Sequence, residues 1–286
     1  MSDEIFQVVA TGMGMSFQDR GRPGWKRFGV PPGGAMDSHA ADWANRILNN
    51  SPDATVLEIL WQGAKLKVLE DSWIAITGAA ALRGTDTWRA VKMTKEQILG
   101  FAPAPAGLWI YVAVEGGFAC ARLLGSSSTY SRGALGTRIA VGDMLRRSAS
   151  SNLSQAERIV PETERRDYSK PPMLRVWPAP QWELFSHDNR RAFFEHEWVV
   201  SPQSDRVGYR LAGTPLTSVR EQILSEPVRV GTIQVPENGL PIVTLRDGPT
   251  VGGYPKLAVL ESADVNWFVQ CRPGQKVRFR MADLQL

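Results

Sequence analysis

At 286 residues the chain is long enough for one large or two medium domains, each with a sizeable hydrophobic core. The formal net charge of +4 is mild and its basic pairs are scattered, which argues against a nucleic-acid-binding stripe. The two cysteines lack metal-ligand spacing, and no run approaches the roughly 20 apolar residues of a membrane helix, so we expect a cytoplasmic protein without a metal site.

The first half of the chain predicts short strands rather than a helical bundle. Its glycines and prolines lie between short apolar runs, as in β-rich proteins. Residues 108–115, LWIYVAVE, are nearly continuous in apolar side chains and predict a fully buried strand. Asp37 or Ser38 is expected to cap a helix over residues 40–48. The other expected strands are residues 6–10, 64–70, 72–77 and 139–145.

Residues 151–172 are polar, charged and bounded by proline, and they predict a linker. It would separate an N-terminal β-rich lobe, residues 1–150, from a C-terminal β-barrel lobe, residues 173–286. In the second lobe we expect helices over residues 188–194 and 263–270, the latter capped by Ser262. The strands expected there are residues 174–177, 228–235, 241–245, 256–260 and 276–281. The predicted fold class is therefore mainly β, with two barrel-like lobes and a few short helices.

The most informative segment is residues 17–37, FQDRGRPGWKRFGVPPGGAMD, a loop with five glycines and three prolines. Such a composition excludes a regular helix or central strand and suits tight turns. Arg20, Arg22 and the Gly33-Gly34 pair make it a candidate binding loop, because long irregular loops that hold charged groups are often functional.

A second loop, residues 245–256, LRDGPTVGGYPK, has the same character. Its glycines, among them Gly252 and Gly253, can form a nest of backbone N–H groups for a carboxylate, phosphate or oxyanion. Asp247, Tyr254 and Lys256 add side chains around that nest. The alternative is a plain strand-connecting turn with solvent-facing charges.

Two further clusters carry polar groups. SDRVGYRL, residues 204–211, offers Arg210 for a polar substrate, although an ordinary Asp–Arg pair at a strand edge explains it equally well. GSSSTYSRGALG, residues 125–136, is rich in hydroxyls and more typical of a solvated loop. Neither a phosphate-loop motif nor a GxSxG elbow occurs in the sequence.

With these segments in view, the chain resembles the family called allophanate hydrolase subunit 2. This family includes the carboxyltransferase-related KipA proteins, also described as the C subunit of 5-oxoprolinase. The resemblance rests on FQDRGRPGW, GVPPGGAMD, LEILWQGAKL, IAITGA, YVAVEGG, LLGSSST, SDRVGYRL and DGPTVGGYPK in that order, and covers nearly the whole chain. Trp25 and Val207 depart from the usual tyrosine and methionine.

The resemblance implies a cyclophilin-like β-barrel. It also implies two partner proteins: a KipI-like B subunit, equivalent to allophanate hydrolase subunit 1, and an A subunit of the LamB/YcsF type. Together such proteins open the lactam of 5-oxoproline to L-glutamate with ATP, which one of the partners binds or shares. Relatives in urea amidolyase instead transfer a carboxyl group from biotin to urea, and a third possibility is a non-catalytic antagonist of a KipI-like inhibitor.

For this chemistry we expect the two glycine-rich loops to face one cleft. The expected catalytic residues are Lys256, Asp247 and Arg20, which would stabilise an oxyanion or act as a base. The residues expected to bind substrate are Arg22, Gly33, Gly34, Arg210, Gly252, Gly253 and Tyr254.

Overall fold

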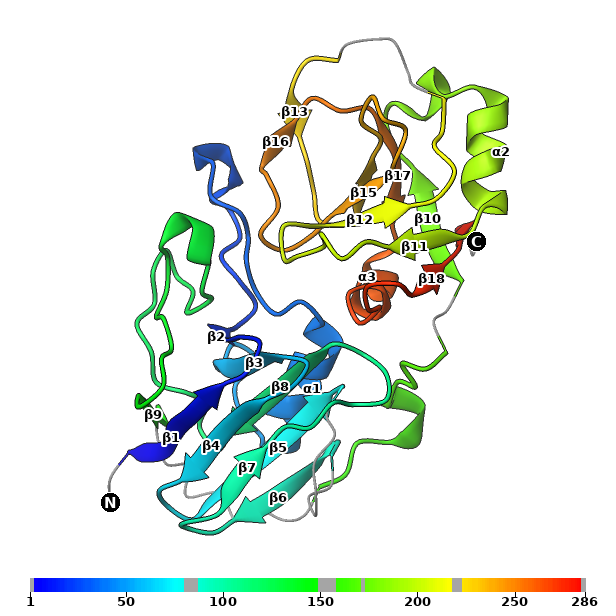
Figure 1. The fold of residues 1–286 in the computed structure, drawn as a ribbon. Coiled ribbons are helices and arrows are strands. Elements are labelled where there is room, and N and C mark those ends of the chain that lie inside the picture. The colour runs from blue at the N-terminus through cyan, green and yellow to red at the C-terminus, as the bar shows by residue number, and fades with distance from the viewer. Residues whose placement is uncertain (1–2, 80–86, 149–157, 171–172, 218–222, 284–286) are drawn as a thin grey trace. The chain divides into compact units, whose positions relative to one another are not determined.

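The computed structural model describes residues 3–79, 87–148, 158–170, 173–217 and 223–283 (Figure 1). By their contacts the residues form two units. The N-terminal unit comprises Met1–Arg22 and Gly33–Ser169, and the C-terminal unit comprises Pro23–Pro32 and Lys170–Leu286. The tip of the first glycine-rich loop thus belongs with the second half of the chain. Residues 158–169, the described end of the expected linker, belong to the N-terminal unit.

The N-terminal unit packs two antiparallel sheets against each other. The five-stranded sheet has the order β2-β3-β8-β5-β6 and the four-stranded sheet the order β7-β4-β1-β9. Apolar side chains of both, such as Val8, Leu66, Ile76 and Val112, form one core. The bounds are β1 (Glu4–Thr11), β2 (Met15–Gln18), β3 (Val56–Leu60), β4 (Ala64–Val68), β5 (Ser72–Gly78), β6 (Arg89–Met93), β7 (Ile98–Gly100), β8 (Trp109–Val114) and β9 (Met144–Arg146).

Helix α1 (Ser38–Ile47) packs on β5 and β8, on the face of the five-stranded sheet that is turned away from this core. Asp37 caps it, with its carboxylate accepting the N–H of Ala40 at 3.0 Å. Every residue of β8 is buried, because the core covers one face of the strand and α1 the other. The expected buried strand and capped helix are both confirmed. Two 3-10 turns, η2 (Ser131–Gly133) and η3 (Glu162–Glu164), complete the described elements of the unit.

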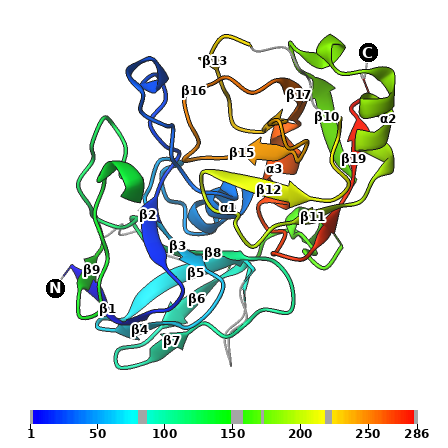
Figure 2. The same cartoon turned by 45° about the horizontal axis from the view of Figure 1, so that its top comes forward.

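The C-terminal unit is built on an eight-stranded sheet with the order β18-β11-β12-β15-β14-β17-β10-β19 (Figure 2). Its two edge strands, β18 and β19, are separated only by Arg278, so the sheet nearly closes into a barrel. The bounds are β10 (Leu174–Pro178), β11 (Trp198–Val200), β12 (Gly208–Ala212), β14 (Thr232–Gln234), β15 (Ile242–Thr244), β17 (Lys256–Leu260), β18 (Lys276–Val277) and β19 (Phe279–Met281). The mainly β fold class is confirmed.

Two helices and a ribbon accompany this barrel. Helix α2 (His187–Glu195) stacks Phe193 on Phe279 at a ring distance of 4.7 Å, and α3 (Ser262–Phe268) sets Phe268 at 5.3 Å from Tyr209. The ribbon pairs β13 (Glu226–Pro227) with β16 (Val251–Gly252). The remaining turns are η1 (Lys26–Phe28) and η4 (Trp182–Leu184).

Several expected boundaries were wrong. In place of the strand expected at 139–145 the chain forms the strand Met144–Arg146, because Asp143 closes a turn by accepting the N–H of Ala140 at 2.8 Å. The strand expected at 228–235 shrinks to β14 because Gly231, at φ 87°, turns the chain just before it. Helix α3 is capped by Glu261 rather than by Ser262. No helix in the described residues has the length and apolar composition needed to span a bilayer.

Candidate functional site

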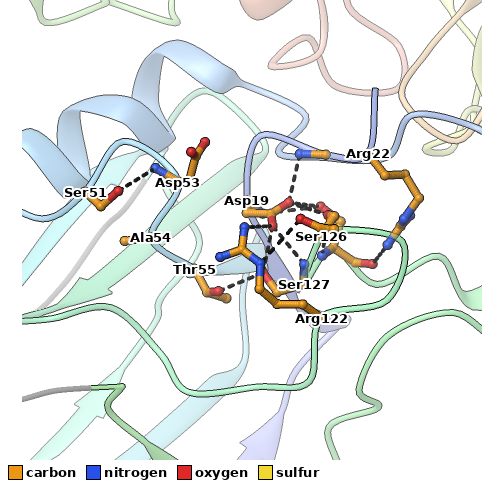
Figure 3. A network of polar contacts seen from close by, with 12 residues as sticks. Asp19, Arg22, Ser51, Asp53, Ala54, Thr55, Arg122, Ser126 and Ser127 are labelled. Atoms are coloured by element: carbon orange, nitrogen blue, oxygen red, sulfur yellow. Dashed lines mark hydrogen bonds and ion pairs between the residues drawn. The ribbon is translucent and has the colours of Figure 1, made fainter. Parts of the chain in front are cut away.

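The buried carboxylate of Asp19 organises the first glycine-rich loop. Its Oδ1 accepts hydrogen bonds from the hydroxyls of Ser126 and Ser128 at 2.6 and 2.7 Å, and Oδ2 accepts the N–H and hydroxyl of Ser127 at 2.8 and 3.0 Å (Figure 3). Oδ1 also accepts the N–H of Gly21 at 2.8 Å. One carboxylate therefore joins the first loop to the serine-rich segment, the fourth cluster of the sequence.

Burial alone would raise the pKa of the Asp19 carboxyl, but the hydrogen bonds from Ser126, Ser127 and Ser128 outweigh burial and hold that pKa below its ordinary value. Asp19 is thus an ionised anchor. All its hydrogen-bond partners stabilise the charged form, so the carboxylate is poorly suited to take up a proton in catalysis.

Arg22, Gly33 and Gly34 meet around this anchor. Arg22 is 1% exposed, and its Nη2 donates to the carbonyl oxygen of Ser128. Gly33 has a φ of 63°, and a Cβ there would lie 3.0 Å from Nη1 of Arg22 and 3.3 Å from Cβ of Ser128. Gly34, at φ 91°, would place a Cβ 3.2 Å from the carbonyl oxygen of Asp19. The glycines are needed for close approach of the chain, and the Arg22 guanidinium lies inside the loop.

Arg20, in contrast, lies at the surface. Its side chain is 54% exposed and pairs with Asp42 of α1 at 3.2 Å. An exposed ion pair of this kind contributes only about 0–1 kcal/mol to stability, so it is readily exchanged for another anion. Among the predicted residues of the first loop, Arg20 is the one whose charge is exposed to solvent.

The end of the first loop is fixed by a buried network that the sequence did not reveal. Oε2 of Glu58 accepts the N–H of Met36 at 2.7 Å and the hydroxyl of Tyr111 at 2.8 Å, and the N–H of Asp37 donates to that hydroxyl at 2.7 Å. Burial, and then the charges of Glu58 and Asp37, raise the pKa of Tyr111 well above its ordinary value. Tyr111 is therefore a neutral structural donor.

The second glycine-rich loop does not form the expected nest. Gly248, Gly252 and Gly253 all lie outside the left-handed region that a nest requires. The N–H of Asp247 donates to the carbonyl oxygen of Arg206 at 2.9 Å, and that of Gly248 to Leu245 at 3.0 Å. A Cβ on Gly248 would lie 2.4 Å from the side chain of Thr244, so glycine serves close packing at this position.

Asp247 is held by a buried ion pair. Its two carboxylate oxygens accept Nε and Nη2 of Arg206 at 2.8 and 3.0 Å, and its side chain is 7% exposed. Arg206 thereby fixes the start of the second loop. With both oxygens occupied, Asp247 is arranged to position the loop rather than to accept a proton.

Lys256 lies in a second buried ion pair, with Glu226 of the β13–β16 ribbon. Its Nζ donates to Oε1 of Glu226 at 2.5 Å, and Gln181 donates to the same oxygen at 2.7 Å. The hydrogen bond from Lys256 outweighs burial and lowers the pKa of Glu226. The Lys256 side chain is 4% exposed and that of Glu226 is 38% exposed. The cation is therefore buried, while its carboxylate partner is partly open to solvent.

The other predicted residues of the C-terminal unit divide between surface and interior. Arg210 is exposed on β12, and Tyr254 is 50% exposed beside the ribbon. Gly252 pairs with Glu226, and a Cβ there would lie 2.7 Å from Oε1 of Gln234. Gly253 is less crowded, with Oγ of Ser225 at 3.4 Å. Glu226, Gln181 and Gln234 were missed, since nothing in their sequence context marks them.

The structure thus assembles two clusters, one in each unit. The first gathers Asp19, Arg22, Gly33 and Gly34, and the second gathers Glu226, Gly252 and Lys256. The tip of the first loop lies with the second cluster's unit, because Nζ of Lys26 donates to the carbonyl oxygen of Val228 at 2.9 Å. That Arg20 and Lys256 face one cleft stays a prediction.

A metal site would need clustered ligand side chains among the described residues, and a phosphate site in the second loop would need free backbone N–H groups. The described residues contain no group of three or more His, Cys, Asp or Glu side chains suited to holding a metal ion. The N–H groups of Asp247 and Gly248 are already bonded, and the glycines of the second loop are not left-handed, so the loop does not form an anion-binding nest.

Comparisons with known proteins agree with this two-unit, mainly β architecture. The family described as carboxyltransferase domain, subdomain A and B, matches residues 28–281, and the chain belongs to that family. More particularly, it is similar to the C subunit of 5-oxoprolinase from Haemophilus influenzae, with 32% identity over 94% of this chain and 89% of that protein.

Two solved structures share the fold but are longer. TTHA0988 matches with a TM-score of 0.88 and 31% identity over 97% of this chain, which spans 55% of the TTHA0988 chain. The Kluyveromyces lactis urea carboxylase matches with a TM-score of 0.86 and 26% identity over 98% of this chain, but over only 27% of its own. Both relatives therefore carry further polypeptide beyond the region that corresponds to this chain.

Proposed function

We propose that this chain is the C subunit of an ATP-dependent 5-oxoprolinase complex, which opens the lactam of 5-oxoproline to L-glutamate. The observation that carries the proposal is the match to the 5-oxoprolinase protein of Haemophilus influenzae along nearly the full length of both chains. Urea carboxylase, in contrast, is matched over about a quarter of its length. In this proposal ATP is bound by, or shared with, a partner protein.

The chain's own part in the reaction is to bind and polarise the substrate. A lactam opens when negative charge develops on its oxygen, and a fixed cation in a dry site stabilises that charge. Lys256 is the buried cation available in the second cluster, and Glu226 keeps its ammonium group in place. We assign Arg210 and Tyr254, which belong to the same unit as Lys256 and have exposed side chains, to the substrate carboxylate and ring.

The remaining predicted residues shape the loops in this proposal. Arg22, Gly33 and Gly34 set the path of the first loop, and Asp247, Gly252 and Gly253 set that of the second. Their substitution would act through misplacement of the exposed groups. Such a displacement, even of about 1 Å, can cost roughly a hundredfold in rate.

A second candidate is a biotin-dependent carboxyltransferase acting on urea or a related amide. It is favoured by the description of the matching family and by the urea carboxylase fold. It requires biotin on a carrier and a biotin carboxylase as partners. The antagonist of a KipI-like inhibitor is a third possibility, in which no turnover occurs.

Deletion of the gene distinguishes these functions. We expect the deletion strain to lose growth on 5-oxoproline as nitrogen source and to recover it with the wild-type gene. A Lys256→Ala gene should not restore growth, whereas Lys92→Ala, an exposed change on β6, should. Unimpaired growth of the deletion strain would contradict the 5-oxoprolinase assignment, and full rescue by Lys256→Ala would contradict the role of Lys256.

A further inference from the structure

The tip of the first glycine-rich loop carries an aromatic pair, of which Phe28 is exposed and Trp25 half-buried. Phe28 is 61% exposed, its ring lies 5.6 Å from that of Trp25, and the guanidinium of Arg27 lies 4.8 Å above it. Gly29, at φ 79°, ends η1 and turns the chain back. A large aromatic side chain held on a short turn, away from any core, is costly to expose unless something covers it.

Three cations accompany this pair: Lys26 and Arg27 belong to the same turn, and the charge of Arg229 acts on Lys26. Lys26, Arg27 and Arg229 make no ion pair with any residue of the described ranges. Burial, and then the charge of Arg229, lower the pKa of Lys26. Two other neighbouring cations of the same unit, Lys276 and Arg278, instead share the carboxylate of Glu197.

The β13–β16 ribbon extends the surface. The carbonyl oxygen of Val228, which follows β13, accepts a hydrogen bond from Nζ of Lys26. Val251 of β16 pairs with Pro227 and is 55% exposed. Figures 1 and 2 both show η1 beside β16. The result is an apolar centre with a cationic rim, which we name the tip surface: Trp25, Lys26, Arg27, Phe28, Arg229 and Val251.

We propose that the tip surface is the docking site for a partner protein that presents an apolar pocket edged by carboxylates. Aromatic residues and arginine are enriched at protein interfaces, while an apolar partner alone would leave three cations desolvated and unpaired. In TTHA0988 this fold is accompanied by further polypeptide, since almost half of that chain lies outside the region matched by this one. The inference rests on the proposed function, in which this chain works with other proteins of a complex.

Binding to the purified KipI-like partner of the proposed complex, measured by calorimetry without substrate or ATP, tests the surface. We expect Phe28→Ala to weaken binding at least about tenfold, or roughly 1.4 kcal/mol. The double variant Arg27→Glu with Arg229→Glu should weaken it further and remove most of its salt dependence. Thermal unfolding of each variant checks that the fold is retained.

Matched changes elsewhere serve as controls. Ile98→Ala removes another exposed apolar side chain, at 54% exposure, and Lys92→Glu with Arg138→Glu reverses two other exposed charges. These variants should bind the KipI-like partner as the wild type does. If wild-type protein binds and the tip variants bind equally well, the docking site is refuted while the proposed function stands. If the wild type itself does not bind, both the docking site and the proposed complex are refuted.

Discussion

Replacing Asp19 by asparagine should loosen the first glycine-rich loop and destabilise the N-terminal unit. The N–H of Gly21 bonds to Oδ1 of Asp19 and the N–H of Ser127 bonds to Oδ2. Whichever way an asparagine amide is oriented, its NH₂ group faces one of these backbone donors. That donor, which is buried at Ser127 and part-buried at Gly21, loses its acceptor.

The magnitude follows from the contacts. One buried N–H without an acceptor costs about 1–3 kcal/mol. The remaining serine hydrogen bonds also lose the charge that makes them roughly twice as strong as neutral ones, so a total near 2–4 kcal/mol is expected. For a unit of this size that corresponds to a fall in melting temperature of about 5–15 °C.

Thermal unfolding and amide hydrogen exchange measure this effect. Exchange at Ser127 should accelerate in Asp19→Asn, while Asp53→Asn, an exposed carboxylate of the same unit, should leave exchange and melting temperature unchanged. The folded-state pKa of Asp19 is lowered, so its contribution is present above the ordinary pKa near 3.8 and disappears as the pH falls through the folded pKa. The stability gap between wild type and Asp19→Asn should therefore close in acid. An unchanged melting temperature, or a gap independent of pH, would refute this reasoning.

Three further outcomes follow from the ion pairs and the thiols. Asp247→Leu should destabilise the C-terminal unit by about 3 kcal/mol in chemical denaturation, because Arg206 is left buried without its carboxylate. Adding Arg206→Met should recover part of that loss. If the effects of the two substitutions on the free energy of unfolding were simply additive, the ion pair would be contradicted. Lys256→Met should raise the pKa of Glu226 in an NMR titration, since the hydrogen bond from the lysine is what lowers it, and an unshifted titration would show that the pair does not form in solution. Burial raises the pKa of the Cys271 thiol to about 12, so it should resist alkylation at pH 8 until the protein unfolds, and rapid labelling of native protein would contradict that burial.

The sequence predicted those features that leave a local pattern. The continuous apolar run of β8 reflects a strand covered on both faces, and Asp37 is followed by the helical spacing that its cap begins. The first loop was recognisable because glycine is needed where an added Cβ would lie about 3 Å from Arg22 or from the loop backbone.

The sequence did not predict contacts made across long separations. Glu58 interrupts the apolar pattern of β3 because it accepts the N–H of Met36 and the hydroxyl of Tyr111, and Glu226 has no local signal for its pairing with Lys256. The nest in the second loop failed for a related reason. Position 248 requires glycine because the side chain of Thr244 packs against it. Composition alone does not distinguish a glycine needed for close packing from one needed for a left-handed turn.

The central claim is tested most directly by reconstitution. The purified KipI-like and LamB/YcsF-type partners should convert 5-oxoproline to glutamate with ATP only when this chain is added, and Lys256→Ala should support the reaction at no more than about a hundredth of the wild-type rate. Ring opening by the two partners that is unaffected by this chain would contradict the claim. So would carboxylation of urea when this chain is supplied with biotinylated carrier and biotin carboxylase in their place.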